Sequence, residues 1–206
     1  MQIEDIVTSL WQEKEKLDNV IEADRARSIL LRVVEMLDSG EVRVADVVDD
    51  QVVVNEWVKQ EILLFFKVQS MTQYNVGPFE FLDKIPLKEN YAKAKVRAVP
   101  GAIARRGSYL APGVTLMPSY VNIGAYVDED TMVDTWATVG SCAQIGKRVH
   151  LSGGVGIGGV LEPPQAAPVV IGDDVFIGSR SMIVEGARIK NGAKLGADLK
   201  HGRCIF

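Results

Sequence analysis

The sequence predicts a mainly β fold, a parallel solenoid, that is preceded by a mostly helical region. Two periodic patterns in the second half of the chain predict the solenoid, and the absence of both from about the first hundred residues predicts the helical region. The first pattern is a six-residue period of branched aliphatic residues. Its positions are Val121, Val127, Val133, Val139, Ile145, Leu151 and Ile157, then Ile171, Ile177, Ile183, Ile189 and Leu195.

The second pattern places a small residue two positions before the next aliphatic one, as at Ala125, Ala137 and Ala143. Residues two apart on a strand point to the same face, so each repeat sends one small and one large side chain inward. Residues that tolerate a tight corner, such as Asn122 and Gly140, often follow the aliphatic position. Three strands and three corners per coil make a triangular prism, and twelve repeats predict about four coils.

An ordinary β-sandwich is the alternative interpretation, but sandwich strands have no fixed period. The repeat resembles that of the left-handed parallel β-helix, and this resemblance, rather than the period, implies the handedness. Between Ile157 and Ile171 the spacing is fourteen residues, and the intervening segment holds three prolines, which cannot donate ladder hydrogen bonds. We therefore expect an external loop near 161–168, either as part of a binding face or as a surface excursion.

The sequence predicts two domains, a mostly helical α+β domain over residues 1–100 and the β-helix over 101–206. Gly40 is placed to end a helix, and Asn55 is placed to cap one. The expected elements are helices over 2–16, 24–38 and 55–66 and strands over Val42–Val47 and Val52–Val54, joined across Asp49 and Asp50.

Composition and charge argue against several classes of protein. The net charge is −4, and no basic stripe with interleaved aromatic residues points to a nucleic acid. No apolar run approaches the roughly twenty residues that a membrane-spanning helix needs. The amino terminus has no basic-then-apolar signal region, and Cys142 and Cys204 have no metal or disulfide spacing. We expect a cytoplasmic protein with two reduced thiols.

The histidines do not suggest a metal site. Zinc-dependent hydration, which some hexapeptide solenoids perform, normally needs three imidazole ligands, and this chain has only His150 and His201. His150 precedes Leu151 and should alternate away from the core, so we interpret it as a solvated surface histidine rather than a general base. His201 is expected in an irregular tail.

The stretch from Leu116 to Pro163 closely resembles the tetrahydrodipicolinate N-succinyltransferases, a family of hexapeptide-repeat acyltransferases. Two long motifs, MVDTWATVGSCAQIG and HLSGGVGIGGVLEP, carry the resemblance. Weaker similarity in LLRVVEMLDSGEVRVA, KIPLK and VRAVPG extends it over nearly the whole chain, up to about residue 196.

The resemblance implies a reaction of diaminopimelate and lysine biosynthesis. A succinyl group passes from succinyl-CoA to the amino group of ring-opened tetrahydrodipicolinate, L-2-amino-6-oxopimelate. Succinyl-CoA is then a co-substrate, and no cofactor is bound permanently. The resemblance also implies a homotrimer whose active sites lie between neighbouring prisms.

By this resemblance, Asp134 holds the substrate ammonium and accepts its proton, which makes it the catalytic residue. Read without the resemblance, Asp134 is a corner residue like Asp128. Arg97 in VRAVPG and Arg180 in IGSRS match carboxylate-binding arginines of the family, a role that suits the bidentate guanidinium. Each arginine is otherwise an ordinary solvated charge.

Ser141 and Gly159 lie in the region where the family binds the pantetheine arm of coenzyme A. Backbone groups there can bind the amides of the arm and stabilise an oxyanion, although the glycines of Gly153–Gly159 suit tight corners equally well. Tyr120 and Trp136 are candidates for covering a subunit interface, with core or rim packing as the alternative.

Two departures from the family leave alternatives open. Where family members commonly carry a glutamate, three residues before the position of Glu185, this chain has Met182, which cannot bind charge or transfer a proton. Family members also continue past Leu195 through another coil, whereas this sequence ends at residue 206. The alternatives are a truncated or degenerate protein that trimerises or binds CoA ligands without turnover, and an acyltransferase for another amine.

Overall fold

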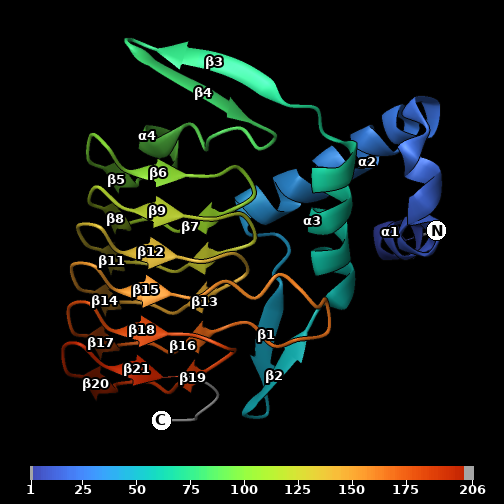
Figure 1. The fold of residues 1–206 in the computed structure, drawn as a ribbon. Coiled ribbons are helices and arrows are strands. Elements are labelled where there is room, and N and C mark those ends of the chain that lie inside the picture. The colour runs from blue at the N-terminus through green and yellow to red at the C-terminus, as the bar shows by residue number, and fades with distance from the viewer. Residues whose placement is uncertain (1, 202–206) are drawn as a thin grey trace.

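The computed structural model describes residues 2–201, in which a helical amino-terminal part packs beside a tall prism of short strands (Figure 1). Two antiparallel hairpins accompany the helices, β1–β2 beside the prism and β3–β4 at its upper end. The helices are α1 (Ile3–Gln12), the 3-10 helix η1 (Lys14–Asp18), α2 (Val20–Ser39), α3 (Glu56–Val68) and α4 (Tyr91–Ala94). The hairpin strands are β1 (Ala45–Val48), β2 (Gln51–Val54), β3 (Thr72–Val76) and β4 (Phe79–Asp83).

The prism has three parallel sheets, and each coil gives one strand to each sheet. Sheet 1 holds β5 (Arg97–Ala98), β8 (Thr115–Leu116), β11 (Met132–Val133), β14 (His150–Leu151), β17 (Phe176–Ile177) and β20 (Lys194–Leu195). Sheet 2 holds β6 (Ile103–Ala104), β9 (Tyr120–Val121), β12 (Thr138–Val139), β15 (Gly156–Ile157), β18 (Met182–Ile183) and β21 (Lys200–His201). Sheet 3 holds β7 (Tyr109–Leu110), β10 (Tyr126–Val127), β13 (Gln144–Ile145), β16 (Val170–Ile171) and β19 (Arg188–Ile189).

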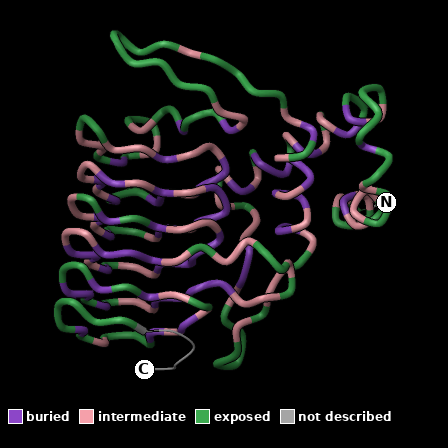
Figure 2. Tube along the Cα trace, in the orientation of Figure 1, coloured by how far each residue is buried: buried purple, intermediate pink, exposed green. Residues whose placement is uncertain are grey.

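The predicted parallel β-helix is confirmed. In Figure 1 the chain crosses the near face from left to right along sheet 2, returns behind it and descends, which is a left-handed path. The aliphatic positions of the period face inward, and Val127, Val133, Ile145 and Leu151 are 0% exposed. The first residue of each strand points away from the prism core, so exposure alternates along most of the coils (Figure 2), although Gln144, Gly156 and Val170 are buried by other parts of the chain.

The prediction of about four coils is wrong, because the prism has about six. The period begins earlier, at Ala98, Ala104, Leu110 and Leu116, and then takes one step of five residues to Val121. That short step and the two alanines, which are not branched, interrupt the pattern of branched aliphatic residues in the first coils. The period also continues past Leu195, because β21 pairs with β18 and places His201 opposite Ile183. The irregular tail expected at His201 is therefore wrong, and Cys204 lies outside the described residues.

The helical part follows the predictions with shifted boundaries. α2 begins at Val20 because the Asn19 side chain accepts hydrogen bonds from the backbone N–H groups of Ile21 (2.9 Å) and Glu22 (3.4 Å). Gly40 ends α2 as predicted, with a φ of 78°. Asn55 precedes α3 but does not cap it, because its side-chain amide donates to the carbonyl of Arg43 instead (2.8 Å). The β3–β4 hairpin was not predicted.

The helical part and the prism share a second apolar core. Ile62 and Phe65 of α3 are 0% exposed and belong to the same cluster as Ile123 and Cys142, which come from prism corners. Prism strands begin at Arg97, and the proposed domain boundary near residue 100 stays a prediction. Among residues 2–201, no helix combines the length and the apolar character that crossing a membrane requires.

Cys142 should be unreactive until the protein unfolds. The residue is 0% exposed, and burial raises the pKa of its thiol to about 12, so almost no reactive thiolate forms at neutral pH. In a Cys204→Ser variant, an aromatic disulfide reagent should find no free thiol in the native protein and one thiol in guanidinium. Reaction of Cys142 at denaturant concentrations that leave the circular dichroism spectrum unchanged would contradict this burial.

Candidate active site

Asp134 lies on the edge between sheets 1 and 2, at the corner that follows β11. Its Oδ1 accepts a hydrogen bond from the backbone N–H of Thr135 (2.7 Å), and its Oδ2 lies 3.4 Å from Nε2 of His150. The Thr135 N–H is the main cause that lowers the pKa of Asp134, and the contact with His150 adds to it. The carboxylate is thus charged at neutral pH, and about a third of its side chain is open to solvent.

His150 is more than the solvated surface histidine that we predicted. It faces outward as expected, but its partner is the candidate catalytic carboxylate. Met132 and Phe176 flank it in register on sheet 1, and the Phe176 ring packs edge-on at a centroid distance of 5.4 Å. The sequence contains a signal for the contact between His150 and Asp134. His150 stands eighteen residues, or one coil of three repeats, after Met132, and Met132 is two residues before Asp134.

Replacing His150 should change the titration of Asp134. In a His150→Phe variant we expect the pKa of Asp134 to rise toward its ordinary value, but only in part, because the Thr135 N–H remains. A His150→Gln variant, which keeps a donor, should show a smaller rise. Carbon NMR titration of the labelled carboxyl measures both, and an unchanged Asp134 in the phenylalanine variant would contradict the pairing. Since the folded pKa is lowered, the contribution of the carboxylate to stability is present above the ordinary pKa and is lost as the pH falls through the folded pKa.

Arg180 lies on the same edge of the prism as Asp134. Backbone hydrogen bonds from Gly154 to Thr135 and from Arg180 to Gly153 place it two coils below Thr135, roughly 10 Å away at the usual strand spacing. Its Nε is 3.4 Å from Asp198, and its side chain is 77% exposed. An ion pair this exposed is weak, so the guanidinium is free to bind a ligand.

Trp136 occupies the corner one coil above Gly154 on this edge. It is 76% exposed and has a φ of 61°, a conformation in which a bulky side chain is uncommon. The backbone N–H of Trp136 donates to the carbonyl of Pro118 (2.7 Å), which fixes the corner. A large apolar ring is therefore held outward beside Asp134.

Arg97 does not join this group within one chain. It is exposed on the outer face of sheet 1, at the start of β5, and it aligns with Thr115 and then with Met132 in register. Two strand spacings put its backbone roughly 10 Å from that of Met132. Arg97 therefore lies on the same sheet face as His150, three strands away.

Ser141 and Gly159 lie together on the other edge of sheet 2, where it meets sheet 3. The Ser141 carbonyl accepts a hydrogen bond from the N–H of Val160 (3.2 Å), and a Cβ on Gly159 would stand only 2.7 Å from the Ser141 Oγ. A Cβ on Gly140 would overlap the Gly159 backbone. This corner is packed backbone to backbone, which gives the glycines a structural role.

The outer face of sheet 2 separates the two edges, and Thr138, Gly156 and Met182 align along it. The thioether of Met182 fills the space over Gly156 that a Cβ would need. Met182 is 40% exposed, so the middle of this face is apolar and open. Glu185 lies at the far edge with Ser141 and does not replace a charge beside Asp134.

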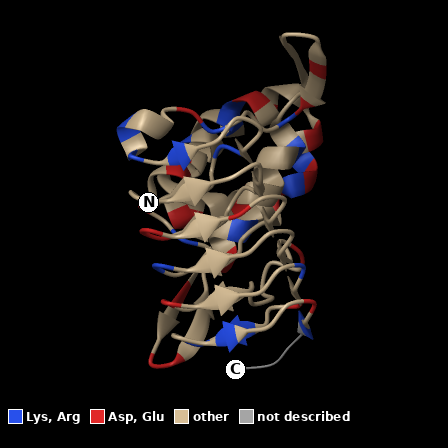
Figure 3. Cartoon of the chain, turned by 90° about the vertical axis from the view of Figure 1, so that its left-hand side faces the viewer, with Lys and Arg blue, Asp and Glu red and all other residues tan. Residues whose placement is uncertain are grey.

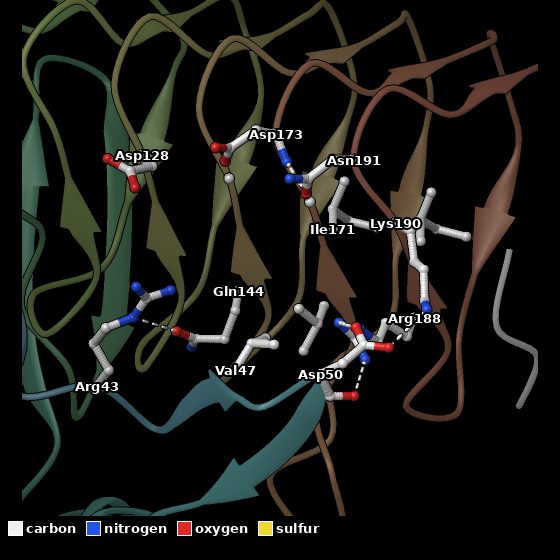
Figure 4. Close-up of a pocket in the computed structure, with 14 residues that line it drawn as sticks. Arg43, Val47, Asp50, Asp128, Gln144, Ile171, Asp173, Arg188, Lys190 and Asn191 are labelled. Carbon is white, nitrogen blue, oxygen red and sulfur yellow. Dashed lines mark hydrogen bonds and ion pairs between the residues drawn. The ribbon is translucent and has the colours of Figure 1, made fainter.

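A cleft of about 550 Å³ lies elsewhere, between the β1–β2 hairpin and sheet 3 (Figure 4). It contains none of the predicted site residues. The cations at one end already bind Asp50, with Arg188 at 2.6 Å and Lys190 at 2.8 Å, and these hydrogen bonds lower the pKa of Asp50. On the side of the prism seen in Figure 3, both signs of charge are interspersed. Within residues 2–201, no three His, Cys, Asp or Glu side chains are grouped to hold a metal ion.

The three parallel sheets, built from two-residue strands on a six-residue period, make this chain a hexapeptide-repeat protein. Residues 2–68 match the family described as Tetrahydrodipicolinate N-succinyltransferase N-terminal. The chain belongs to the tetrahydrodipicolinate N-succinyltransferase family, as the resemblance predicted.

Its similarity to individual relatives extends along both parts. A 2,3,4,5-tetrahydropyridine-2,6-dicarboxylate N-succinyltransferase from Ralstonia nicotianae is 47% identical over 98% of this chain and 76% of its own. The protein of that name from Paraburkholderia phymatum is 49% identical with the same coverage. Among solved structures, the acetyltransferase domain of PglB from Neisseria gonorrhoeae is 21% identical over 54% of this chain and 48% of its own, with a TM-score of 0.40.

Proposed function

We propose that this chain transfers the succinyl group of succinyl-CoA to the amino group of ring-opened tetrahydrodipicolinate, a step of diaminopimelate and lysine biosynthesis. The observation that carries the proposal is the 47–49% identity to succinyltransferases over nearly the whole chain. The charged Asp134 beside an open sheet face supports the same chemistry.

The reaction requires a neutral amine, a thioester and a place for the released proton. Asp134 binds the substrate ammonium and takes one of its protons, and the neutral amine that results attacks the thioester carbonyl. The new C–N bond forms, the C–S bond of the tetrahedral intermediate breaks, and a second proton from the nitrogen passes to the sulfur, so coenzyme A leaves as its thiol. One proton is released overall. Because the pKa of Asp134 is lowered, its carboxylate holds the ammonium well and keeps the proton only briefly.

The remaining predicted residues have complementary roles in this proposal. Arg180, on the edge that carries Asp134, binds one substrate carboxylate, and Arg97 binds the other. Ser141 and Gly159 line the path of the pantetheine arm at the opposite edge of sheet 2. The thioester carbonyl then lies over sheet 2, between the two edges.

The proposal includes a homotrimer in the cytoplasm, where succinyl-CoA is available. Large apolar side chains near the edge between sheets 1 and 2 support a subunit contact there. These side chains are Trp136 (76% exposed), Met182 (40%), Phe176 (38%) and Leu199 (37%). For a 22.5 kDa chain, light scattering should give three times that mass.

The test is turnover with defined substrates. Purified protein incubated with succinyl-CoA and L-2-aminopimelate, a stable acyclic analogue, should release coenzyme A and form one equivalent of the N-succinyl product by mass spectrometry. Binding of succinyl-CoA without release would indicate a non-catalytic protein, an alternative that the relatives' names do not support. Faster reaction with amino sugars would assign another amine as the acceptor.

A further inference from the structure

Lys59 is a buried cation whose hydrogen bonds go to one loop. It lies on α3, is 0% exposed, and its Nζ donates to the carbonyls of Pro163 (3.2 Å) and Ala166 (2.7 Å). Burial lowers the pKa of the ammonium, and the charge of Glu56 on the same helix offsets this only in part. No ion pair to Lys59 forms among the residues that the structure describes. A cation in this position is costly, so the loop carbonyls are its main compensation.

The loop that Lys59 holds is the segment 160–168, which leaves the prism between β15 and β16. The same Pro163 carbonyl accepts the N–H of Ala166 (3.0 Å), which folds the loop into a turn around the ammonium. Leu161 packs against the apolar cluster under the helices. The loop is therefore docked on the helical part rather than free in solvent.

The docked loop begins at the corner proposed to bind the thioester arm. Val160 follows Gly159 directly and donates its N–H to the Ser141 carbonyl. Gly140 and Gly159 leave no room for a Cβ between their coils, so a shift of the loop is not absorbed by loose packing. Only Leu161 and Glu162 separate Val160 from Pro163, so the hydrogen bonds of Lys59 lie close to this corner along the chain.

We infer that Lys59 is a positioning residue for the thioester site, because its ammonium ties the loop to α3 and fixes the Ser141–Gly159 corner. This inference rests on the proposed function. It assigns to the helical part a role in binding succinyl-CoA, although α3 is separated from Asp134 by the prism. Lys59 touches neither substrate, so its loss should change the affinity for the thioester more than the chemical step.

The first test is steady-state kinetics of Lys59→Met, which keeps the length of the apolar stem and removes the charge. The KM for succinyl-CoA should rise about tenfold, from the loss of hydrogen bonds to a charged group. The KM for 2-aminopimelate should stay within twofold and kcat within threefold. Lys59→Arg, which restores a cationic donor, should recover part of the affinity.

Lys84→Met is the matched control. Lys84 also donates to a backbone carbonyl of α3, that of Phe66 (2.7 Å), but does not touch the loop. The Lys84→Met variant should leave the KM values for succinyl-CoA and for 2-aminopimelate unchanged. An unchanged KM for succinyl-CoA in Lys59→Met, or an equal rise in both KM values, would overturn the inference. If Lys59→Met does not fold, Lys59→Gln, which keeps a neutral donor, takes its place, and a wild-type KM in that variant overturns the inference.

Hydrogen exchange separates this inference from the proposed function. Amides of residues 160–167 that are not prolines should exchange faster in Lys59→Met than in the wild type, with no substrate present. If the wild type does not turn over succinyl-CoA, the proposed function fails, and the exchange experiment still reports whether Lys59 holds the loop. Unchanged exchange would show that it does not.

Discussion

Replacing Asp134 with asparagine lowers kcat about 10²–10⁴-fold, the usual contribution of a positioned acid–base group. The amide oxygen can still accept the N–H of Thr135, so the corner keeps its local hydrogen bond and the fold keeps its stability. Only the charge that holds the ammonium and the oxygen that takes the proton are lost. Steady-state kinetics with succinyl-CoA and 2-aminopimelate measures the effect.

Asp128→Asn is the matched control for Asp134. Asp128 occupies a similar corner, and its Oδ1 accepts the N–H of Glu129 (2.8 Å), but it lies on the edge between sheets 3 and 1. Its replacement should leave kcat within twofold. Equal activity of the Asp134 and Asp128 variants would reduce Asp134 to a corner residue and contradict its catalytic role.

The pH profile provides a second test of Asp134. The Thr135 N–H and His150 lower the pKa of this carboxyl below its ordinary value of 3.8, so it stays ionised throughout the neutral and mildly acid range. Loss of activity between pH 7 and 5 should therefore report the substrate ammonium or another group. That acid limb should stay at the same pH in Asp134→Glu. A limb that moves with this substitution would contradict the assignment.

Gly140→Ala should destabilise the protein by about 3 kcal/mol, at the upper end of the usual cost of overpacking. The added methyl group would overlap the backbone of Gly159 in the next coil, and backbone cannot rotate away as a side chain can. At roughly 2–4 °C per kcal/mol for a chain of this size, the Tm should fall by about 6–12 °C. Calorimetry at fixed protein concentration measures the change.

Gly196→Ala provides the control for Gly140. Gly196 is exposed, and nothing lies within 4 Å of a Cβ placed on it. Its replacement should change the Tm by no more than about 1 °C, because an open surface site has little effect on stability. A Tm for Gly140→Ala that matches that of Gly196→Ala would mean that the coils can separate at the Ser141–Gly159 corner.

The six-residue period predicted the prism because each strand is set by local residues, one small and one large, that repeat. The prediction of the number of coils failed where the six-residue pattern of aliphatic residues is interrupted. Ala98 and Ala104 are small, and the step from Leu116 to Val121 is one residue short, so the first coils were missed. The cap predicted at Asn55 failed because its amide found partners in the neighbouring hairpin.

The site was predictable to the extent that it depends on spacing within the prism. Asp134 and His150 meet because His150 lies one coil, eighteen residues, after Met132, which stands two residues before Asp134. The bonds from Lys59 to Pro163 and Ala166 span more than a hundred residues and depend on how α3 docks against the prism. No local pattern carries that information, so the link between the helical part and the Gly159 corner became visible only in the folded chain.

The most direct measurement is a crystal structure of the protein with succinyl-CoA and 2-aminopimelate in the Asp134→Asn variant, in which turnover is slowed about 10²–10⁴-fold. The amino nitrogen should lie within hydrogen-bond distance of residue 134. The thioester carbonyl should lie over the outer face of sheet 2, with the pantetheine arm along Ser141 and Gly159. Binding of the amine in the cleft beside sheet 3, or of the thioester away from sheet 2, would contradict the proposed arrangement of the site.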